Sequence, residues 1–563
     1  MPDGHFQVIV IGSGFGGAVS AYRFAEAGQS VCVLERGKSY PPGSFPRSPY
    51  EMKRNFWDPS QGLHGMFNVW SFRNLGAVVS SGLGGGSLIY ANVLIRKDER
   101  WFVHERPGRP GYEAWPITRA DLEPHYDNVE RVLAPQRYPD QVAPYAQTPK
   151  LLAMKSAAAA LASRAGPGQV EFLLPQLAVT FGNTGRRPVP GEPIVEPFPN
   201  LHERTRDTCR LCGECDIGCN YGSKNTLDYN YLTLAQRASA VIRSRCEVRS
   251  FEPLAGGGYR VSYVEHSDDV LDTKALPLLT LTCDKLVLSA GAIGSTFLLL
   301  KNRAHFPGLS PRLGHAMNGN GDILGLMLHS HDHETGQGRV TEPSRGPVIT
   351  SALRFADQLD GVGATGRGFY VEDAGFPQFV DWLVQSADIG GSAARFAGFL
   401  WTWIKMHTVA NPSSDLGTAL SSLLGSGTFT RSALPLLGMG RDVPTGVASL
   451  NELGLLALDW SLEPSQAYFE RVRAAMREMS EALDGKYQDD PLWALSREIT
   501  VHPLGGCPMG ASPSEGVVNP WGEVFGYPGF YIADGSVLPG PVGPNPSLTI
   551  AACADRFAER ALQ

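Results

Sequence analysis

Residues 6–17 read Phe-Gln-Val-Ile-Val-Ile-Gly-Ser-Gly-Phe-Gly-Gly, and this stretch decides the fold. The first six residues alternate and are rich in β-branched side chains, which predicts a strand, and the glycines predict a tight turn into a helix over 18–27. A second strand over 31–34 ends in Glu35. Strand, glycine turn, helix, strand and terminal acid together form the dinucleotide-binding fingerprint of a Rossmann-like α/β unit.

Each part of this fingerprint has a chemical purpose. Gly12 makes the tight turn, Gly14 lets the backbone approach a pyrophosphate, and Gly17 packs the helix on the strand. The N-terminus of the helix, near Phe15, offers a site for an anion. Glu35 stands where an acid accepts hydrogen bonds from an adenosine ribose. A turn without a ligand is the alternative, and the complete pattern argues against it.

Later strands indicate which dinucleotide binds. A second strand and turn covers residues 285–291, and a third strand near the C-terminus ends in Asp534. An acid at that place is suited to hold a polyol hydroxyl, such as those of the ribityl chain of a flavin. The sequence therefore favours FAD over a nicotinamide dinucleotide.

Composition narrows the class of protein. A length of 563 residues predicts two closely connected domains. The net charge of −7 and the lack of a basic cluster argue against a nucleic-acid partner. The N-terminus lacks the pattern of an export signal, and the longest uncharged apolar run, 286–300, contains a turn. We therefore expect a cytoplasmic, reduced setting, in which the nine cysteines are thiols or metal ligands.

Three segments near the C-terminus predict a redox site. They are His-Pro-Leu-Gly-Gly-Cys at 502–507, residues 529–535 and residues 543–547. Oxidation of an alcohol needs a base for the hydroxyl proton, and a histidine suits that task. Pro546 in the first turn of a predicted helix would let the positive end of that helix face a flavin. His502 is thus the predicted base, and a core histidine with satisfied hydrogen bonds is the alternative.

The sequence resembles the glucose-methanol-choline (GMC) oxidoreductase family, and most of all its cholesterol oxidase branch. The matching segments are residues 12–17, 82–88, 289–295, 318–320, the block that begins at His502, and 534–545. The resemblance implies an α/β fold with two interleaved domains. A discontinuous Rossmann-like FAD-binding domain would cover 1–45, 222–325 and 500–563, and a substrate-binding domain built on a large mixed β-sheet with helices would cover 46–221 and 326–499.

The same resemblance implies roles for single residues. His502 matches the active-site histidine of the family and Asn545 its partner. Glu372 aligns over a few residues with a glutamate of the sterol oxidases, and a plain surface acid is the alternative. Tyr90 stands where the sterol oxidases usually have a small residue, which leaves the substrate open. The residues predicted to bind FAD are Gly12, Gly14, Phe15, Gly17, Glu35, Gly84, Gly85, Gly86, Ser87, Asn92, Ala290, Gly291, Asp534, Gly535, Asn545 and Pro546.

A cysteine cluster is the second candidate site. Cys209, Cys212, Cys215 and Cys219 have the spacing of the bacterial ferredoxin motif without its final proline. Four such thiolates suit an iron–sulfur cluster, 4Fe–4S or 3Fe–4S, or a structural zinc. Four reduced thiols without metal are the alternative. Some glucose-dehydrogenase relatives in the family carry an iron–sulfur centre between flavin and an external acceptor, so the resemblance adds weight to a cluster.

An apolar insert over residues 376–440 is rich in Phe, Trp and Leu. Core helices explain such a stretch. The alternative is a lid over an apolar pocket that also makes peripheral contact with a membrane. Asp381, Asp388 and Arg395 exclude a membrane span.

Taken together, these features predict an FAD-dependent dehydrogenase or oxidase that acts on the CH–OH group of a hydrophobic alcohol, with a sterol favoured. Hydride would pass to flavin N5 while His502 takes the hydroxyl proton, and the electrons would leave to oxygen, a quinone or a carrier protein. Two alternatives stay open. One is a lyase of the same family with non-redox FAD, and the other is an electron-transfer flavoprotein without an organic substrate.

Overall fold

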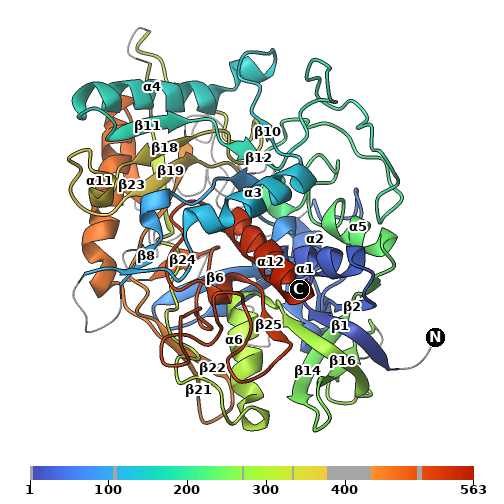
Figure 1. The fold of residues 1–563 in the computed structure, drawn as a ribbon. Coiled ribbons are helices and arrows are strands. Elements are labelled where there is room, and N and C mark those ends of the chain that lie inside the picture. The colour runs from blue at the N-terminus through green and yellow to red at the C-terminus, as the bar shows by residue number, and fades with distance from the viewer. Residues whose placement is uncertain are drawn as a thin grey trace.

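The computed structural model describes residues 4–47, 49–105, 111–268, 270, 272–332, 335–376, 433–490, 493 and 497–563. Most of the apolar insert predicted over 376–440 therefore lies outside the described residues, and so do the core-helix and lid interpretations of it. Within the described part the chain builds two main sheets, one in each half of the molecule (Figure 1).

The first sheet has parallel strands at its centre. The strand order is β13–β2–β1–β16–β25, and the antiparallel hairpin β14–β15 pairs with the first half of β16. The bounds are β1 His5–Ile11, β2 Val31–Leu34, β13 Val241–Arg243, β14 Cys246–Pro253, β15 Tyr259–Glu265, β16 Leu279–Leu288 and β25 Phe530–Ile532. Residues 8–10 of β1 are fully buried, as expected for a parallel strand covered on both faces. The strands come from three distant parts of the chain, in agreement with the predicted fold class.

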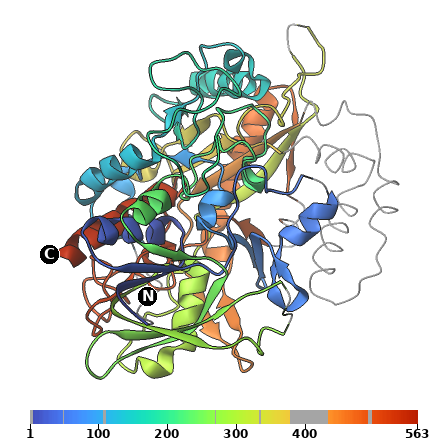
Figure 2. The ribbon, with the colours of Figure 1, turned by 90° about the vertical axis from the view of Figure 1, so that its right-hand side faces the viewer.

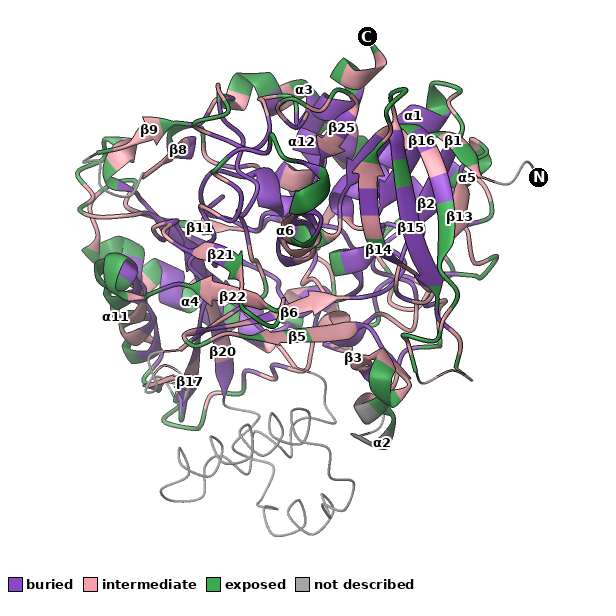
Figure 3. Cartoon of the chain, turned by 90° about the horizontal axis from the view of Figure 1, so that it is seen from below, coloured by how far each residue is buried: buried purple, intermediate pink, exposed green. Residues whose placement is uncertain are grey.

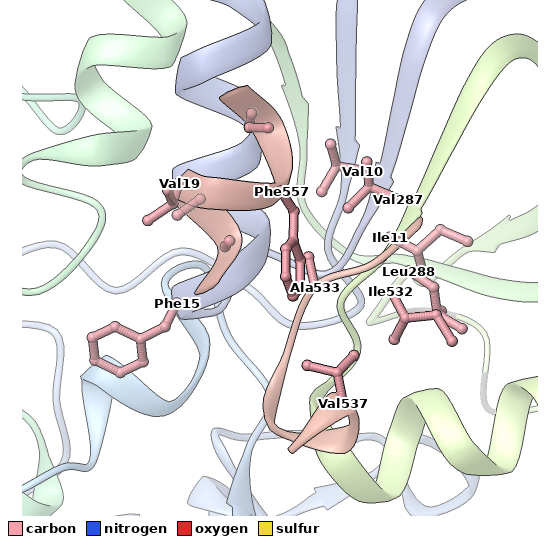
Figure 4. Close-up of a cluster of buried hydrophobic side chains, with 14 of the residues drawn as sticks. Val10, Ile11, Phe15, Val19, Val287, Leu288, Ile532, Ala533, Val537 and Phe557 are labelled. Atoms are coloured by element: carbon pink, nitrogen blue, oxygen red, sulfur yellow. The ribbon is translucent and has the colours of Figure 1, made fainter. Parts of the chain in front are cut away.

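Helices cover this sheet on both sides. One face carries α1 Phe15–Glu26, α5 Tyr231–Arg237 and α12 Ser547–Leu562, with α3 Arg119–Leu133 packed on α12, while α6 Gly291–Lys301 lies on the other face (Figure 2). The core around this sheet and beneath its helices contains, on both faces, Val10, Ile11, Val19, Val287, Leu288, Ile532 and Phe557 (Figure 4). Burial of one such large apolar side chain contributes about 1.5–3 kcal/mol, so this interface is a main source of stability.

The second sheet has six strands in the order β11–β18–β19–β20–β17–β23. Their bounds are β11 Val170–Leu173, β17 Ile323–Leu328, β18 Ala352–Phe355, β19 Phe369–Asp373, β20 Leu434–Gly440 and β23 Lys486–Asp489. Every described pairing in this sheet is antiparallel, where the sequence analysis expected a mixed sheet. The helices α4 Pro149–Arg164 and α11 Gln466–Ala482 pack on it. The domain boundary predicted near 325 falls inside β17.

Smaller elements complete the described chain. β24 Glu498–Thr500, β6 Leu75–Ser80 and β5 Phe67–Ser71 form a three-stranded sheet, less buried than the first sheet (Figure 3). The others are β10 Gln136–Arg137 with β12 Gln176–Leu177 and β7 Val93–Leu94, β21 Val447–Leu450 with β22 Leu456–Asp459, β3 Trp57–Asp58 with β4 Leu63–His64, β8 Val103–His104 with β9 Glu113–Ala114, and the short helix α2 Pro49–Met52. None of the helices in the described ranges has the length and apolar character needed to cross a bilayer.

The first turn of the nucleotide fingerprint is packed on one side and open on the other. A Cβ on Gly16 would lie 1.3 Å from the carbonyl oxygen of Ala533, and one on Gly17 would lie 2.1 Å from that of Gly12. A Cβ on Gly14 would meet nothing within 4 Å. Only the packed side therefore excludes a side chain.

We expect Gly16→Ala to lower the free energy of unfolding by about 3 kcal/mol or more, because the backbone at Ala533 has to move to admit the methyl group. Gly14→Ala, in the same turn, is the matched control and should change that free energy by less than about 1 kcal/mol. Urea unfolding of the two proteins, stripped of any cofactor, measures both. Equal stability of the two variants would contradict the packing of this turn.

Candidate active site and cofactor cradle

Two glycine loops meet beside the carboxyl end of β1. A Cβ on Gly85 would lie 2.6 Å from the Cα of Gly14, and Gly84 N donates a hydrogen bond to the hydroxyl oxygen of Ser13 at 3.0 Å. A Cβ on Gly86, like one on Gly14, would meet nothing within 4 Å. The structure thus brings two predicted cofactor loops together beside open space, at the N-terminus of α1 where an anionic pyrophosphate is favoured.

Two of the predicted cofactor acids brace the turns of this cradle. Glu35 accepts hydrogen bonds from the backbone N–H and the hydroxyl of Ser13, at 3.0 and 2.7 Å. Asp534 accepts hydrogen bonds from Gly291 N at 2.9 Å and from the hydroxyl of Ser295 at 2.5 Å. Both acids therefore hold glycine turns in place. Their contacts with a ribose and a ribityl chain stay predictions.

Asn92 supports the presence of a bound group. Its φ is +73°, its side chain is fully buried, and neither of its amide atoms has a hydrogen-bond partner among the described residues. A buried polar group without a partner costs about 1–3 kcal/mol, so this amide fits a ligand such as FAD. Of the other predicted cofactor residues, Phe15, Ala290, Gly535 and Pro546 lie at the starts of α1, α6, a 3-10 helix over Gly535–Val537, and α12. Ser87 lies in the second glycine loop, where its hydroxyl donates a hydrogen bond to Gly84 O at 2.7 Å.

His502 lies two residues after β24, and the carboxyl group of Asp322 lies next to its Nδ1. Its Nδ1 is 2.9 and 3.1 Å from the two carboxylate oxygens of Asp322, whose side chain is 1% exposed. A carboxylate accepts hydrogen bonds, so the proton of a neutral ring lies on Nδ1 and Nε2 is left as an acceptor. The His502 side chain is 15% exposed, which keeps the ring accessible at its free edge.

Asn545 and Glu372 meet from opposite halves of the molecule. Asn545 Nδ2 donates a long hydrogen bond of 3.4 Å to Glu372 Oε2, and both side chains are buried. Burial above all, together with the nearby Asp373 and Asp322, raises the pKa of Glu372 to about 8, while the bond from Asn545 opposes this shift. Glu372 is therefore an uncharged carboxyl at neutral pH. Its Oε1 and the Oδ1 of Asn545 have no partner among the described residues.

Two residues that hold this site, Asn320 and Asp322, are not among the residues predicted from the sequence. Asp322 orients His502, as described above. Asn320 Oδ1 accepts hydrogen bonds from Val542 N and Gly543 N, at 2.9 and 3.0 Å, and thereby fixes the loop that presents Asn545. Both residues lie in or next to segment 318–320, which the family resemblance had identified. The concentration of polar side chains in this glycine-rich segment is the sequence signal that could have pointed to both residues.

The four predicted cysteine ligands line one small cavity. Cys209, Cys212, Cys215 and Cys219 face it together with Lys224, and none of the four is in a disulfide. Burial first, and the neighbouring thiols next, raise the pKa of Cys209. In the part of the chain that the structure describes, no three His, Cys, Asp or Glu side chains are grouped closely enough to hold a metal ion.

Lys224 connects the cysteine loop with the cofactor loop. Its buried Nζ donates hydrogen bonds to the carbonyl oxygens of Leu88 at 3.0 Å and Cys215 at 2.8 Å. The same ammonium lies 4.8 Å from the ring centroid of Tyr90, which packs edge-on against Phe15 with centroids 5.4 Å apart. The cysteine cavity is therefore adjacent to the second glycine loop of the cradle.

Several known proteins are similar to this chain over nearly its whole length. A GMC oxidoreductase family model matches residues 447–554, and an FAD binding domain model matches residues 7–41. The chain is 29% identical over 568 residues to a cholesterol oxidase of Mycobacterium tuberculosis (strain ATCC 25618 / H37Rv), covering 99% of this chain and 91% of that protein. It is 27% identical to a cholesterol oxidase of Acinetobacter baumannii, covering 98% of this chain and 93% of that protein. The crystal structure of pyridoxine 4-oxidase from Mesorbium loti matches with a TM-score of 0.53 at 15% identity over 98% of both chains, a likeness of fold alone.

The raised pKa of Glu372 predicts how stability changes with pH. Because the folded protein holds this proton more tightly than the unfolded chain does, the stabilising effect is present at low pH and is lost as pH rises toward 8. Relative to the wild type, Glu372→Gln should therefore gain roughly 2 kcal/mol of unfolding free energy between pH 6 and pH 8. Urea unfolding at several pH values measures this difference. A constant difference across that range would mean that Glu372 is ionised throughout.

Proposed function

We propose that this chain, a member of the GMC oxidoreductase family with an FAD-binding domain, oxidises the CH–OH group of a lipophilic alcohol. The observation that carries the proposal is the pairing of His502 with Asp322. It leaves an accessible ring nitrogen as a hydrogen-bond acceptor, on a loop joined to the cofactor cradle. FAD, when bound, supplies the acceptor for the two electrons and the hydrogen of the carbinol carbon.

His502 serves as the general base in this proposal. Its Nε2 accepts the hydroxyl proton of the alcohol, and the positive charge that forms on the ring faces the carboxylate of Asp322. A positioned base of this kind contributes about 10²–10⁴-fold to the rate.

Asn545 and Glu372 orient the substrate. At neutral pH the Glu372 carboxyl is protonated, so it donates a hydrogen bond without placing a negative charge beside the oxygen that is losing its proton. The Oδ1 of Asn545 and the Oε1 of Glu372 have no described partner and are free for the substrate. In this proposal, Asn545 and Glu372 are uncharged groups that hydrogen-bond the substrate, and His502 is the base.

The substrate class is a lipophilic alcohol, with a sterol as the leading candidate. Full-length similarity to two cholesterol oxidases supports it. Tyr90, the departure from the sterol oxidase pattern, is held by Phe15 and Lys224, and its hydroxyl donates to Asn225 O at 3.3 Å. These contacts hold the Tyr90 ring on the side that faces the cysteine loop. The tyrosine is therefore compatible with a bulky substrate.

The cysteine loop is our proposed exit for electrons. The ferredoxin spacing and the link through Lys224 to the cofactor loop support this role. The four thiols face one cavity, but in the described structure they are not grouped closely enough to hold a metal ion, so they would have to move together to bind a cluster. Cys209, Cys212, Cys215 and Cys219 would hold an iron–sulfur cluster, and that cluster would supply one-electron transfer. The acceptor is then a quinone or a carrier protein, whereas oxygen is the acceptor of an enzyme without the cluster.

Anaerobic titration with sterols, long-chain alcohols and hexoses tests the proposed reaction. We expect a lipophilic alcohol to bleach the visible absorbance of the flavin, and His502→Gln to slow that bleaching by about 10²–10⁴-fold while it retains FAD. His305→Gln, at an exposed histidine, is the matched control and should react like the wild type. If none of these alcohols reduces the flavin, the lyase or the electron-transfer flavoprotein is the better description.

Iron and sulfide analysis of protein isolated without oxygen tests the proposed electron exit. We expect both elements in the wild type and in Cys283→Ser, a buried cysteine of β16, and neither in Cys212→Ser. Cys212→Ser should still be reduced by the alcohol, but it should pass electrons to a one-electron acceptor at least about tenfold more slowly. Wild-type protein without iron would remove the cluster from the proposal and leave the alcohol chemistry intact.

A further inference from the structure

Asp322 makes different contacts with its two carboxylate oxygens. Oδ1 is the nearer one to His502 Nδ1, at 2.9 Å. Oδ2 accepts a hydrogen bond from Val501 N at 2.9 Å and lies 2.9 Å from the hydroxyl of Thr500. The side chain is almost fully buried, so these protein groups, and not water, decide how it is oriented.

Two further buried acids stand near Asp322. Glu498 lies in β24, and neither of its carboxyl oxygens has a partner among the described residues. Asp442 follows β20 and accepts a hydrogen bond from Gly319 N at 3.1 Å. Burial above all, and then the charge of neighbouring acids that include Asp322, raises the pKa of both carboxyls. Asp322 is the acid of this cluster with the most hydrogen-bond donors.

We infer that Asp322 is a positioning residue for the oxidation of the alcohol. It holds the imidazole of His502 with its proton on Nδ1, so that the lone pair of Nε2 is directed to the substrate hydroxyl. In the proton transfer the O–H bond of the alcohol breaks, an N–H bond forms at Nε2, and the imidazolium is balanced by the buried carboxylate. This inference rests on the proposed function, because it needs His502 as the base.

The contacts of Asp322 predict what an amide in its place would do. In Asp322→Asn the amide oxygen is expected at the position of Oδ2, because the backbone N–H of Val501 needs an acceptor there. The amide N–H groups then take the position of Oδ1 and donate to His502 Nδ1. The ring proton moves to Nε2 as a result, and Nε2 can no longer accept a proton. The shape of the site is kept while the tautomer is reversed.

The experiment is nitrogen NMR of FAD-loaded protein labelled with ¹⁵N-histidine, together with anaerobic flavin reduction by the alcohol. The His502 signals are assigned by their loss in His502→Gln. We expect the Nδ1–H tautomer in the wild type and the Nε2–H tautomer in Asp322→Asn. The same variant should reduce its flavin about 10³-fold more slowly or worse, with less than about a threefold change in KM.

Glu498→Gln is the matched control, because it makes the same acid-to-amide change in the same buried cluster. Glu498 makes no described hydrogen bond to His502, so this variant should keep the wild-type tautomer and a rate within about threefold of the wild type. A loss as large as that of Asp322→Asn would overturn the inference, since any change in the cluster would then suffice.

The remaining outcomes separate this inference from the proposed function. If His502→Gln oxidises the alcohol as fast as the wild type, the proposed base fails and the role of Asp322 fails with it. If His502→Gln is inactive while Asp322→Asn keeps both tautomer and rate, only the positioning role is overturned. Wild-type protein that carries the Nε2–H tautomer overturns it too, even if Asp322→Asn does not fold.

Discussion

A close contact between the backbones of Gly16 and Ala533 determines how the N-terminal and C-terminal segments of this chain are arranged. Gly16, in the first turn of α1, faces the carbonyl of Ala533 so closely that no side chain fits between them. The N-terminal and C-terminal segments are thereby joined in one sheet. The same C-terminal segment is tied to the loop of the candidate base, because Gly505 N donates a hydrogen bond to Gly535 O at 3.0 Å. One close approach therefore places both the cofactor cradle and the base.

Polar side chains from one short segment then set the geometry of the chemistry. Asn320 fixes the loop before Asn545, and Asp322 fixes His502, so residues 320–322 hold both halves of the candidate site. The segment runs directly into β17, whose neighbours on either side are β20 and β23. The second sheet thus anchors the segment that holds the candidate site. Buried and satisfied hydrogen bonds of this kind orient functional groups more sharply than apolar packing does.

Features that depend on local interactions could be predicted from the sequence, whereas features that depend on contacts between distant segments could not. The strand, turn and helix around Gly14 have a local pattern, and the structure contains all three. The antiparallel pairing of the second sheet depends on contacts between distant segments, which no local period reveals. Glu372 was found through a short alignment, and its contact with Asn545 joins residues that lie far apart in the chain. Asp322 was missed because the polar, glycine-rich segment 318–322 does not reveal by itself which side chain it will contact. Its importance comes from the ring that another loop brings to it.

The candidate site also shows how one fold gives similar acids different charges. Asp322 has a ring N–H and a backbone N–H as donors, Glu372 has one long hydrogen bond, and Glu498 has none among the described residues. Donors stabilise a carboxylate, and burial without donors favours the neutral acid. The environment thus keeps the negative charge behind the imidazole and an uncharged carboxyl beside Asn545. In the proposed reaction, a carboxylate at Glu372 would repel the oxygen that loses its proton, and without Asp322 the ring of His502 would lose the partner that balances its positive charge. The proposal therefore combines base catalysis and neutral hydrogen bonding in one buried space.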